Sequence, residues 1–294
     1  MIPREWLKNI RRIELRTSRL VEDILAGQYH SVFKGRGMDF DEVRPYTAGD
    51  DVRRIDWNVT ALTGVTHIKK FVEEREMTVL LMVDASASKN VGSFGPSKRE
   101  LAAELAALIG FAAARNNDNV GLLLFTEGAE RYIRPGKGRS HILRIIGEVL
   151  SHEPERKGTD IALALAHVRH ALRRRAIIFI LSDFLDSKLH ERPLRILRQR
   201  HDVIGIPVMD PGERDLPDVG TIVFEDSESG ELVEVDSADL EVRESYSKAS
   251  WARMEELRRM FRRSGVDSIE VHTDRPYLKP LLQFFDTRIR RQNR

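Results

Sequence analysis

The chain contains no cysteine among its 294 residues. This absence excludes disulfide bonds, zinc sites built on thiolates, iron–sulfur clusters and a cysteine nucleophile, because each of them needs the sulfur atom. It also favours a reducing compartment, where proteins do not depend on disulfides for stability.

Long hydrophobic runs are also missing. No apolar stretch approaches the roughly 20 residues that a helix needs to cross a bilayer. Residues 1–19 are charged throughout and lack the apolar centre of a secretory signal. We therefore predict a soluble, cytoplasmic protein.

Neither sign of charge dominates. The 48 Lys and Arg residues nearly balance the 46 Asp and Glu residues, so the net charge of +2 gives no strong electrostatic case for nucleic acid as the main partner. Charged residues make up 32% and hydrophobic residues 41% of the chain, which predicts a densely ionic surface around a sizeable core. No Gly-x-x-x-x-Gly-Lys-Ser/Thr motif occurs, so we expect no ATP binding through a P-loop.

The pattern changes at about residue 75. Over residues 4–27 the apolar positions recur with nearly a helical period, which predicts a helical arm. Over residues 29–66 glycine, proline and paired charges predict loops and turns with short strands. We assign residues 1–75 to this N-terminal arm and loop, and residues 76–294 to one α/β domain.

Within residues 76–294, short apolar runs alternate with helical patterns. Strands buried on both faces are predicted at 77–83, 120–125, 176–182 and 203–208, an edge strand at 130–134, a last strand at 268–272, and an inserted β-hairpin at 221–236. Helices are predicted from the capping box of Ser97 and Glu100 to Asn116, over 140–150 with Ser140 as the cap, over 160–174, through Leu194 and Leu197, over 239–264, and from about Tyr277. This alternation predicts a doubly wound, mostly parallel sheet.

Three polar motifs lie where predicted strands end or predicted helices begin. They are Asp84-Ala85-Ser86-Ala87-Ser88, Gly158-Thr159-Asp160 and Ser182-Asp183. Ligands of an open parallel sheet bind at the carboxyl ends of its strands, so we expect the three motifs to converge. Their carboxylate and hydroxyl oxygens suit a hard cation such as Mg²⁺, with Mn²⁺ or Ca²⁺ as substitutes, and disfavour zinc. The first motif by itself also fits a polar turn with helix-capping serines.

The D-x-S-x-S string after a buried strand, followed by Thr159 and Asp183, resembles the metal-ion-dependent adhesion site of von Willebrand factor A domains. The resemblance implies a von Willebrand factor A or Rossmann-like fold. It also implies a metal that binds an acidic side chain of a protein partner. Asp160 stands either beside these ligands or as a first-turn acid that favours the helix dipole. The implied metal ligands are Asp84, Ser86, Ser88, Thr159 and Asp183.

The segment GRGMDFDEVRPYTAGDDVRRIDWN (35–58), with EERE before the first strand, is similar to the signature of bacterial domain-of-unknown-function family 58. The resemblance covers about residues 30–290. It implies a metal-dependent interaction module that accompanies a MoxR-type AAA+ ATPase and is not an enzyme. Lys89 stands where relatives usually have an apolar residue, and its ammonium either weakens metal binding or pairs with Asp118 or another local carboxylate.

The 35–58 segment has two interpretations. It is either a docking surface for the partner or a solvated loop held by ion pairs, each worth at most about 1 kcal/mol when exposed. The residues expected to bind a partner are Arg36, Asp39, Arg44, Asp50, Asp51, Arg53, Asp56 and Trp57.

Two rival functions stay open. The first is a Mg²⁺-dependent phosphohydrolase with Asp84 as nucleophile, although Ser86 stands where a second acid normally protonates the leaving group. The second is an RNA-binding scaffold that uses the arginine clusters at 173–175, 258–263 and 288–294. His167 and His170 are spaced to share a helix face, and no third metal ligand accompanies them in the sequence.

Overall fold

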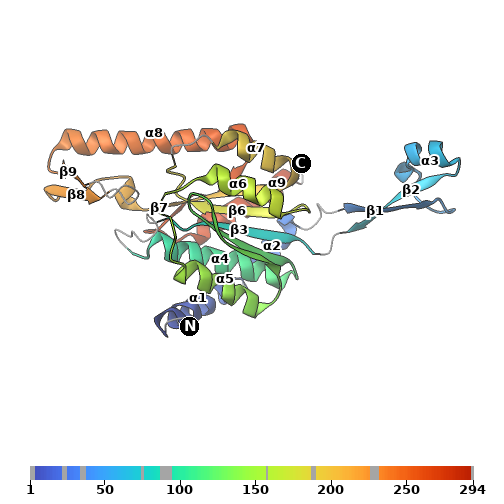
Figure 1. Ribbon diagram of the computed structural model, residues 1–294, viewed down its shortest axis with the longest axis horizontal. Helices are drawn as coiled ribbons and strands as arrows, with labels where there is room; N and C mark the ends of the chain where they lie inside the picture. Colours follow the sequence, from blue (N-terminus) through green and yellow to red (C-terminus); the bar gives the residue numbers. More distant parts are fainter. Residues whose placement is uncertain are drawn as a thin grey trace.

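The computed structural model describes residues 4–21, 25–33, 38–73, 76–86, 95–156, 158–186, 190–225 and 232–292. Its centre is a seven-stranded sheet of order β10-β7-β6-β3-β4-β5, in which β11 also pairs with β7 (Figure 1). The strands are β3 (Thr78–Asp84), β4 (Asn119–Phe125), β5 (Ala129–Gly136), β6 (Ile177–Ser182), β7 (Asp202–Met209), β10 (Asp267–Ser268) and β11 (Val271–His272).

Most neighbouring strands of this sheet are parallel. β3 runs parallel to both β4 and β6, and β7 is parallel to β6, β10 and β11. Only β5 is antiparallel, and it closes one edge against β4. The predicted α/β class, with a doubly wound and mostly parallel sheet, is therefore confirmed.

Helices cover both faces of the sheet (Figure 1). One face packs against α1 (Arg4–Leu20), α2 (Ala26–Phe33), α4 (Lys98–Arg115), α5 (Arg139–Ser151) and α9 (Leu278–Gln292). The other face packs against α6 (Ile161–Ala171), α7 (Glu191–Arg200) and α8 (Leu240–Ser264).

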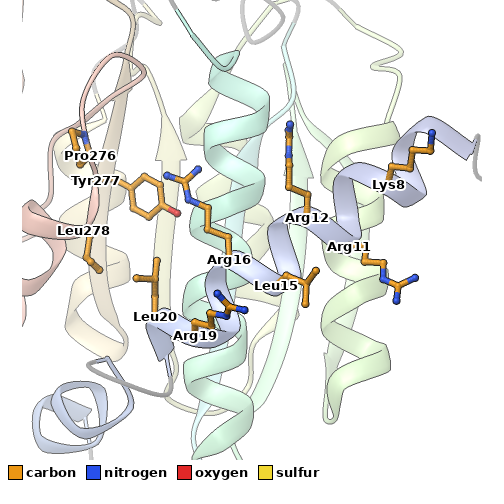
Figure 2. A pocket seen from close by; sticks show the side chains of 10 residues that line it. All are labelled: Lys8, Arg11, Arg12, Leu15, Arg16, Arg19, Leu20, Pro276, Tyr277 and Leu278. Carbon is orange, nitrogen blue, oxygen red and sulfur yellow. The ribbon is translucent and has the colours of Figure 1, made fainter.

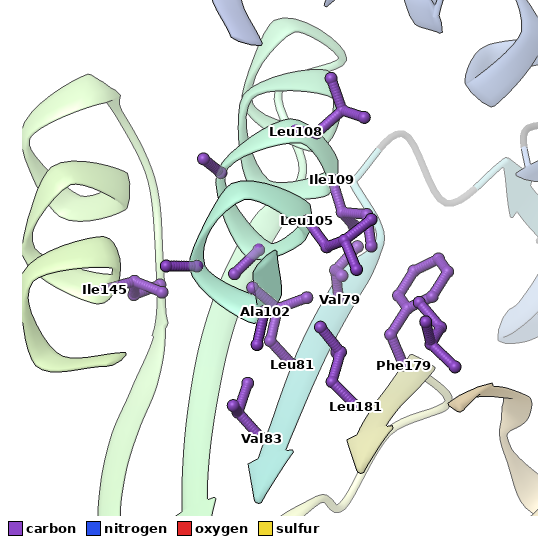
Figure 3. Close-up of a cluster of buried hydrophobic side chains, with 14 of the residues drawn as sticks. Val79, Leu81, Val83, Ala102, Leu105, Leu108, Ile109, Ile145, Phe179 and Leu181 are labelled. Carbon is purple, nitrogen blue, oxygen red and sulfur yellow. The ribbon is translucent and has the colours of Figure 1, made fainter. Parts of the chain in front are cut away.

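Strand β3 shows why the apolar runs of the sequence are continuous. Val79, Leu81 and Val83 point toward α4 (Figure 3), whereas Leu80 and Met82 belong to the cluster on the opposite face. Because side chains of a strand alternate between faces, a strand covered on both sides must be apolar at every position.

The predicted start of α4 is confirmed, and the predicted start of α5 is wrong. Ser97 and Glu100 form a complete capping box, and Asn117, with φ of 62°, follows the end of α4. Helix α5 instead begins after Gly138, whose φ of 90° turns the chain, and no side chain caps it. Ser140 therefore lies inside the helix.

The N-terminal region differs from the single helical arm predicted over residues 4–27. It contains two helices, α1 and α2, and both pack on the body of the protein. Ile10 and Ile13 of α1 join the same buried cluster as Tyr29 and Phe33 of α2. The apolar period continues past residue 20 because both helices bury one stripe against a common core.

The predicted loop region is an ordered arm that projects from the body (Figure 1). Antiparallel strands β1 (Met38–Pro45) and β2 (His67–Glu73) form its stem. A 3₁₀ helix, η2 (Val52–Arg54), and a helix, α3 (Trp57–Thr63), form its end. We call the segment from residue 38 to residue 73 the arm.

The C-terminal third contains the remaining elements. The predicted hairpin is present as β8 (Thr221–Glu225) antiparallel to β9 (Leu232–Asp236), and its turn at Ser229-Gly230 lies outside the described residues. A 3₁₀ helix, η4 (Pro211–Glu213), follows β7. The single strand predicted over 268–272 is two short strands, β10 and β11. Within the described ranges, no helix is both long and apolar enough to span a membrane.

A substitution at Gly205 of β7 tests the packing of α8 on the sheet. A Cβ at this position of β7 would lie 2.6 Å from Cζ of Phe261 in α8. We expect Gly205→Ala to lower the free energy of unfolding by about 1–3 kcal/mol, because the added methyl group overpacks the core. Gly27→Ala, where a Cβ meets open space in α2, is the matched control and should cause no loss. Equal urea midpoints for the two variants would contradict this packing.

Candidate functional site at the carboxyl edge of the sheet

The candidate site lies between the carboxyl ends of β3 and β6. These strands are neighbours, but the helices that follow them, α4 and α7, cover opposite faces of the sheet. Such a reversal leaves a crevice at the strand ends, which is where open α/β sheets bind ligands. Asp84 is the last residue of β3, and Ser182 and Asp183 stand at the end of β6.

Asp84 is buried and is fixed by groups from both strand ends. Its Oδ1 accepts a hydrogen bond from the backbone nitrogen of Ser86 at 3.0 Å, and its Oδ2 accepts one from Oγ of Ser182 at 2.7 Å. The Ser182 hydroxyl in turn accepts the backbone N–H of Phe184 at 3.1 Å. Ser86 is also buried, so this part of the predicted ligand set forms a preorganised polar corner.

The loop that carries Thr159 reaches the same edge. Next to it, the backbone nitrogen of Asp160 donates to the carbonyl of Thr126, just after β4, at 2.9 Å. The nitrogen of Ile161 donates to Oδ2 of Asp186, just after β6, at 3.0 Å. Asp160 also caps α6 by accepting a hydrogen bond from the nitrogen of Leu163. Half-buried Thr159 therefore stands among strand ends.

Asp183 has a partner that the sequence analysis did not identify. Lys98, the first residue of α4, is fully buried, and its Nζ donates to Oδ2 of Asp183 at 2.9 Å. The same ammonium also donates to Oε1 of Glu213 in η4. A signal for this arrangement exists in the sequence, because a lysine in the first turn of a helix faces the positive end of the helix dipole and needs a nearby carboxylate.

The polar network continues along the edge to β7 and β11. Glu213 accepts the backbone N–H of Asp210 at 3.1 Å, and buried Asp210 accepts a hydrogen bond from Oγ1 of Thr273 at 2.8 Å. Carboxylates thus follow the ends of β3, β6 and β7, and a buried lysine joins two of them. Asp84, Ser86 and Asp183 stand at the ends of the neighbouring strands β3 and β6, and Thr159 lies in the loop bonded to Thr126 and Asp186, whereas Ser88 and Lys89 lie outside the described residues.

Most of the charged residues assigned to partner binding have structural contacts within the arm. Arg44 donates to both carboxylate oxygens of Asp50, at 2.9 and 2.7 Å. This guanidinium, with the N–H and hydroxyl of Thr47, holds the pKa of Asp50 well below its usual range. Asp51 caps η2 through the nitrogen of Arg53.

Asp56 has two structural roles in the arm. It caps α3 and forms an ion pair with Lys69 of β2, with 3.5 Å between Oδ2 and Nζ. The hydrogen bonds that it accepts from Val59 and Asn58, and the charge of Lys69, lower its pKa. Arg36 lies outside the described residues, and Asp39 is described only as a backbone position of β1 that pairs with Val72.

The end of the arm presents apolar side chains to solvent. Trp57 is 70% exposed and Leu62 is 86% exposed, and Val52 and Val65 are each more than half exposed. Trp57 is among the predicted partner-binding residues, and the three aliphatic residues are not. We call Val52, Trp57, Leu62 and Val65 the apolar tip.

Residues 42–256 match the model of the family described as "Protein of unknown function DUF58". The chain belongs to this family. Uncharacterised proteins of Mycobacterium tuberculosis and Mycobacterium bovis are 35% identical to it over 284 residues, which cover 96% of this chain and 89% of each relative.

The solved structures similar to this DUF58 protein include BatB and the VWA domain of SpRpn10. BatB of Bacteroides thetaiotaomicron has a TM-score of 0.48 and 16% identity, and the match covers 73% of this chain and 99% of BatB. The VWA domain of SpRpn10 has a TM-score of 0.39 and 12% identity, with 70% of this chain and 94% of that domain covered.

His167, His170 and two arginines of the C-terminal clusters of this DUF58 protein have structural partners. His167 stacks edge-on against Tyr132, and Nδ1 of His170 contacts the carbonyl of Ala166 at 2.8 Å. Arg258 forms two hydrogen bonds with Glu270, and buried Arg288 bridges Asp202 and Asp267. These contacts favour structural roles over RNA contacts for Arg258 and Arg288.

The donor set at the edge suits a hard cation in its chemistry, since Asp84, Ser86, Thr159 and Asp183 supply only oxygen. Among the described residues, no three His, Cys, Asp or Glu side chains group into a metal site, so hydroxyl ligands would have to complete the coordination. A divalent ion on Asp183 must also compete with the ammonium of Lys98.

Lys98→Met tests this buried ion pair. The change removes the Lys98 ammonium from the carboxylate of Asp183, whose side chain is only 6% exposed, so we expect a loss of about 3 kcal/mol or more in the free energy of unfolding. Lys248→Met is the control, because its pair with Glu244 is largely exposed and worth less than about 1 kcal/mol. Urea unfolding measures both, and a small loss for Lys98→Met would contradict the pairing.

Proposed function

We propose that this DUF58 protein is a protein-interaction module, without catalytic activity of its own, that docks on a MoxR-type AAA+ ATPase. The observation that carries the proposal is the arm, which projects from the body (Figure 1) and ends in exposed apolar side chains. Neither feature contributes to the core of the protein, and an apolar surface of this kind is typical of a binding site.

The arm is built to present its tip in one conformation. Strands β1 and β2 pair from Met38–Glu73 to Pro45–His67, and the Arg44–Asp50 pair and the Asp56 cap fix the turns beyond them. A preorganised element loses less conformational entropy on binding than a flexible loop does. The charged residues of the segment therefore support docking indirectly, by shaping the surface that carries Trp57.

The carboxyl edge of the sheet is the second part of the proposal. We propose that Asp84, Ser86, Ser88, Thr159 and Asp183 bind Mg²⁺ there and that an acidic side chain of the partner completes its coordination. The shared edge and the oxygen-only donor set support this assignment. A single metal–carboxylate contact at a wet rim contributes more to specificity than to affinity.

The hydrogen bonds of Asp84 argue against the phosphohydrolase alternative. Both of its carboxylate oxygens accept a hydrogen bond, from Ser86 and from Ser182, which lowers their nucleophilicity.

The cytoplasmic location expected from the sequence stays a prediction and is part of this proposal.

Substitutions in the apolar tip test the docking role. Trp57→Ala and Leu62→Ala should each weaken binding to the ATPase at least tenfold, because exposed aromatic and aliphatic anchors carry most of an interface's energy. Trp251→Ala is the matched control, since Trp251 is 52% exposed on α8 and does not belong to the arm. Calorimetry with the purified partner gives the Kd. Unchanged affinity for both tip variants, or an equal loss for Trp251→Ala, would rule out the tip as the interface.

Metal dependence is tested separately. Titration of Mg²⁺ should show binding to the wild type and at least a tenfold loss for Ser86→Ala/Ser88→Ala, because two hydroxyl ligands disappear. EDTA should then reduce affinity for the ATPase. Ser247→Ala, whose hydroxyl bonds Asp215 on the surface, is the control. If wild type and double variant bind Mg²⁺ alike, the ligand assignment is wrong even where the arm docks as proposed.

A further inference from the structure

A groove lies between α1 and the segment that leads into α9 (Figure 2). Its volume is about 920 Å³, and neither the carboxyl edge nor the arm contributes to it. The lining residues divide into a basic set from α1 and an apolar set from both sides. They are Lys8, Arg11, Arg12, Arg16 and Arg19, and Leu15, Leu20, Pro276, Tyr277 and Leu278.

Helix α1 has two faces with different roles. Ile10, Ile13 and Thr17 are buried against the body, where α1 packs beside α4 and α5. The basic residues and Leu15 lie on the other face, and Figure 2 shows their side chains spread along the helix. Packing of the core explains the residue types on the buried face of α1 but not those on its basic face.

The charges of the groove are only partly balanced. Arg12 and Arg16 reach Glu100 and Glu104 of α4, at 3.8 and 3.1 Å. Within the described part of the chain, Lys8, Arg11 and Arg19 form no ion pair, and no acidic side chain lines the groove. A ligand that enters it meets an excess of positive charge.

The apolar side of the groove is accessible. Leu15 is 60% exposed, and Pro276 and Leu278 flank it from the opposite wall (Figure 2). The ring of buried Tyr277 lies 5.9 Å from the guanidinium carbon of Arg16, and its hydroxyl interacts with Glu104 of α4. The groove therefore offers aliphatic contact area and cationic donors.

We propose that this groove binds an acidic amphipathic segment of a protein partner. Leucine-type anchors at helical spacing would fill the apolar side, as in other helix-in-groove complexes, and Asp or Glu side chains between them would pair with Lys8, Arg11 and Arg19. Guanidinium groups favour carboxylates because they donate two parallel hydrogen bonds.

The shape and composition of the groove favour a peptide over other anionic partners. A bilayer is flat and needs a protruding apolar face, whereas Leu15 and Leu278 line a concavity. Single-stranded nucleic acid needs several exposed aromatic rings for stacking, and Tyr277, the aromatic residue of the lining, is buried. The proposal goes beyond the docking role of the arm, because the two surfaces share no residue.

Selection from a random library tests the proposal without knowledge of the natural partner. The full chain is used to select 15-residue peptides by display. Peptides that also bind Arg11→Glu/Arg19→Glu are discarded. We expect the survivors to be enriched in Asp and Glu with Leu, Ile or Phe at i, i+3 or i+4 and i+7 positions. Survivors without acidic enrichment, or no survivors at all, would overturn the proposal.

A synthetic copy of one selected peptide then locates the site. Leu15→Asp should weaken its binding at least tenfold, as should Arg11→Glu/Arg19→Glu. Arg134→Glu/Arg169→Glu, which makes the same charge change at exposed arginines outside the groove, should leave the Kd within twofold. Equal losses in both double variants would show general charge attraction and overturn the assignment.

Vesicles and the arm variant complete the test. Vesicles of phosphatidylglycerol and phosphatidylcholine should bind the wild type and the groove variant alike, because a membrane is not the proposed ligand. Vesicle binding that depends on Arg11 and Arg19 while peptides do not bind would assign the surface to anionic lipid instead. Trp57→Ala should bind the peptide normally, so failure of the arm proposal and failure of the groove proposal remain distinguishable.

Discussion

The structure depends on the requirement that a parallel sheet be covered on both faces. Every residue of β3 from Val79 to Val83 is buried, with alternate side chains in two different clusters. A polar group on either face would lie in the core without water, which costs free energy unless it is hydrogen-bonded. The polar and charged side chains of the body are therefore confined to the strand ends, where Asp84 and Asp183 stand, and to the outer surfaces of the helices.

Each end of the sheet has a buried cation that bridges two carboxylates. At the carboxyl edge, Lys98 joins Asp183 to Glu213 and so connects α4, β6 and η4. At the amino edge, Arg288 of α9 joins Asp202 to Asp267, the first residues of β7 and β10. Burial of ions is costly, and removal of one partner leaves an uncompensated charge, so these bridges specify how helices meet strand ends more than they add stability.

The sequence predicts the secondary structure that depends on local periodicity. It does not predict contacts between residues that are distant in the chain, or the arrangement of elements in space. The buried strands follow from uninterrupted apolar runs, and the Ser97 cap follows from the spacing of Ser97 and Glu100. The first-turn position of Lys98 signals the need for a carboxylate, but its contact with Glu213 spans 115 residues, so no local pattern identifies the partner. Ser140 fails as a cap because Gly138, in the left-handed region, begins α5 earlier. The exposure of Leu62 follows from the projection of the arm, which periodicity does not encode.

Some exposed apolar residues of this protein are available for binding because folding does not require them. Single exposed leucines are ordinary on a protein surface, because too little polar surface exists to cover it. The apolar tip is different, because Val52, Trp57, Leu62 and Val65 are all more than half exposed within one short part of the arm. Charged partners fix the turns around them, so the arm is ordered without their burial. The side chains of the apolar tip neither stabilise the arm nor pack on the body. They are therefore available to a partner, and the energy of binding comes from residues outside the core.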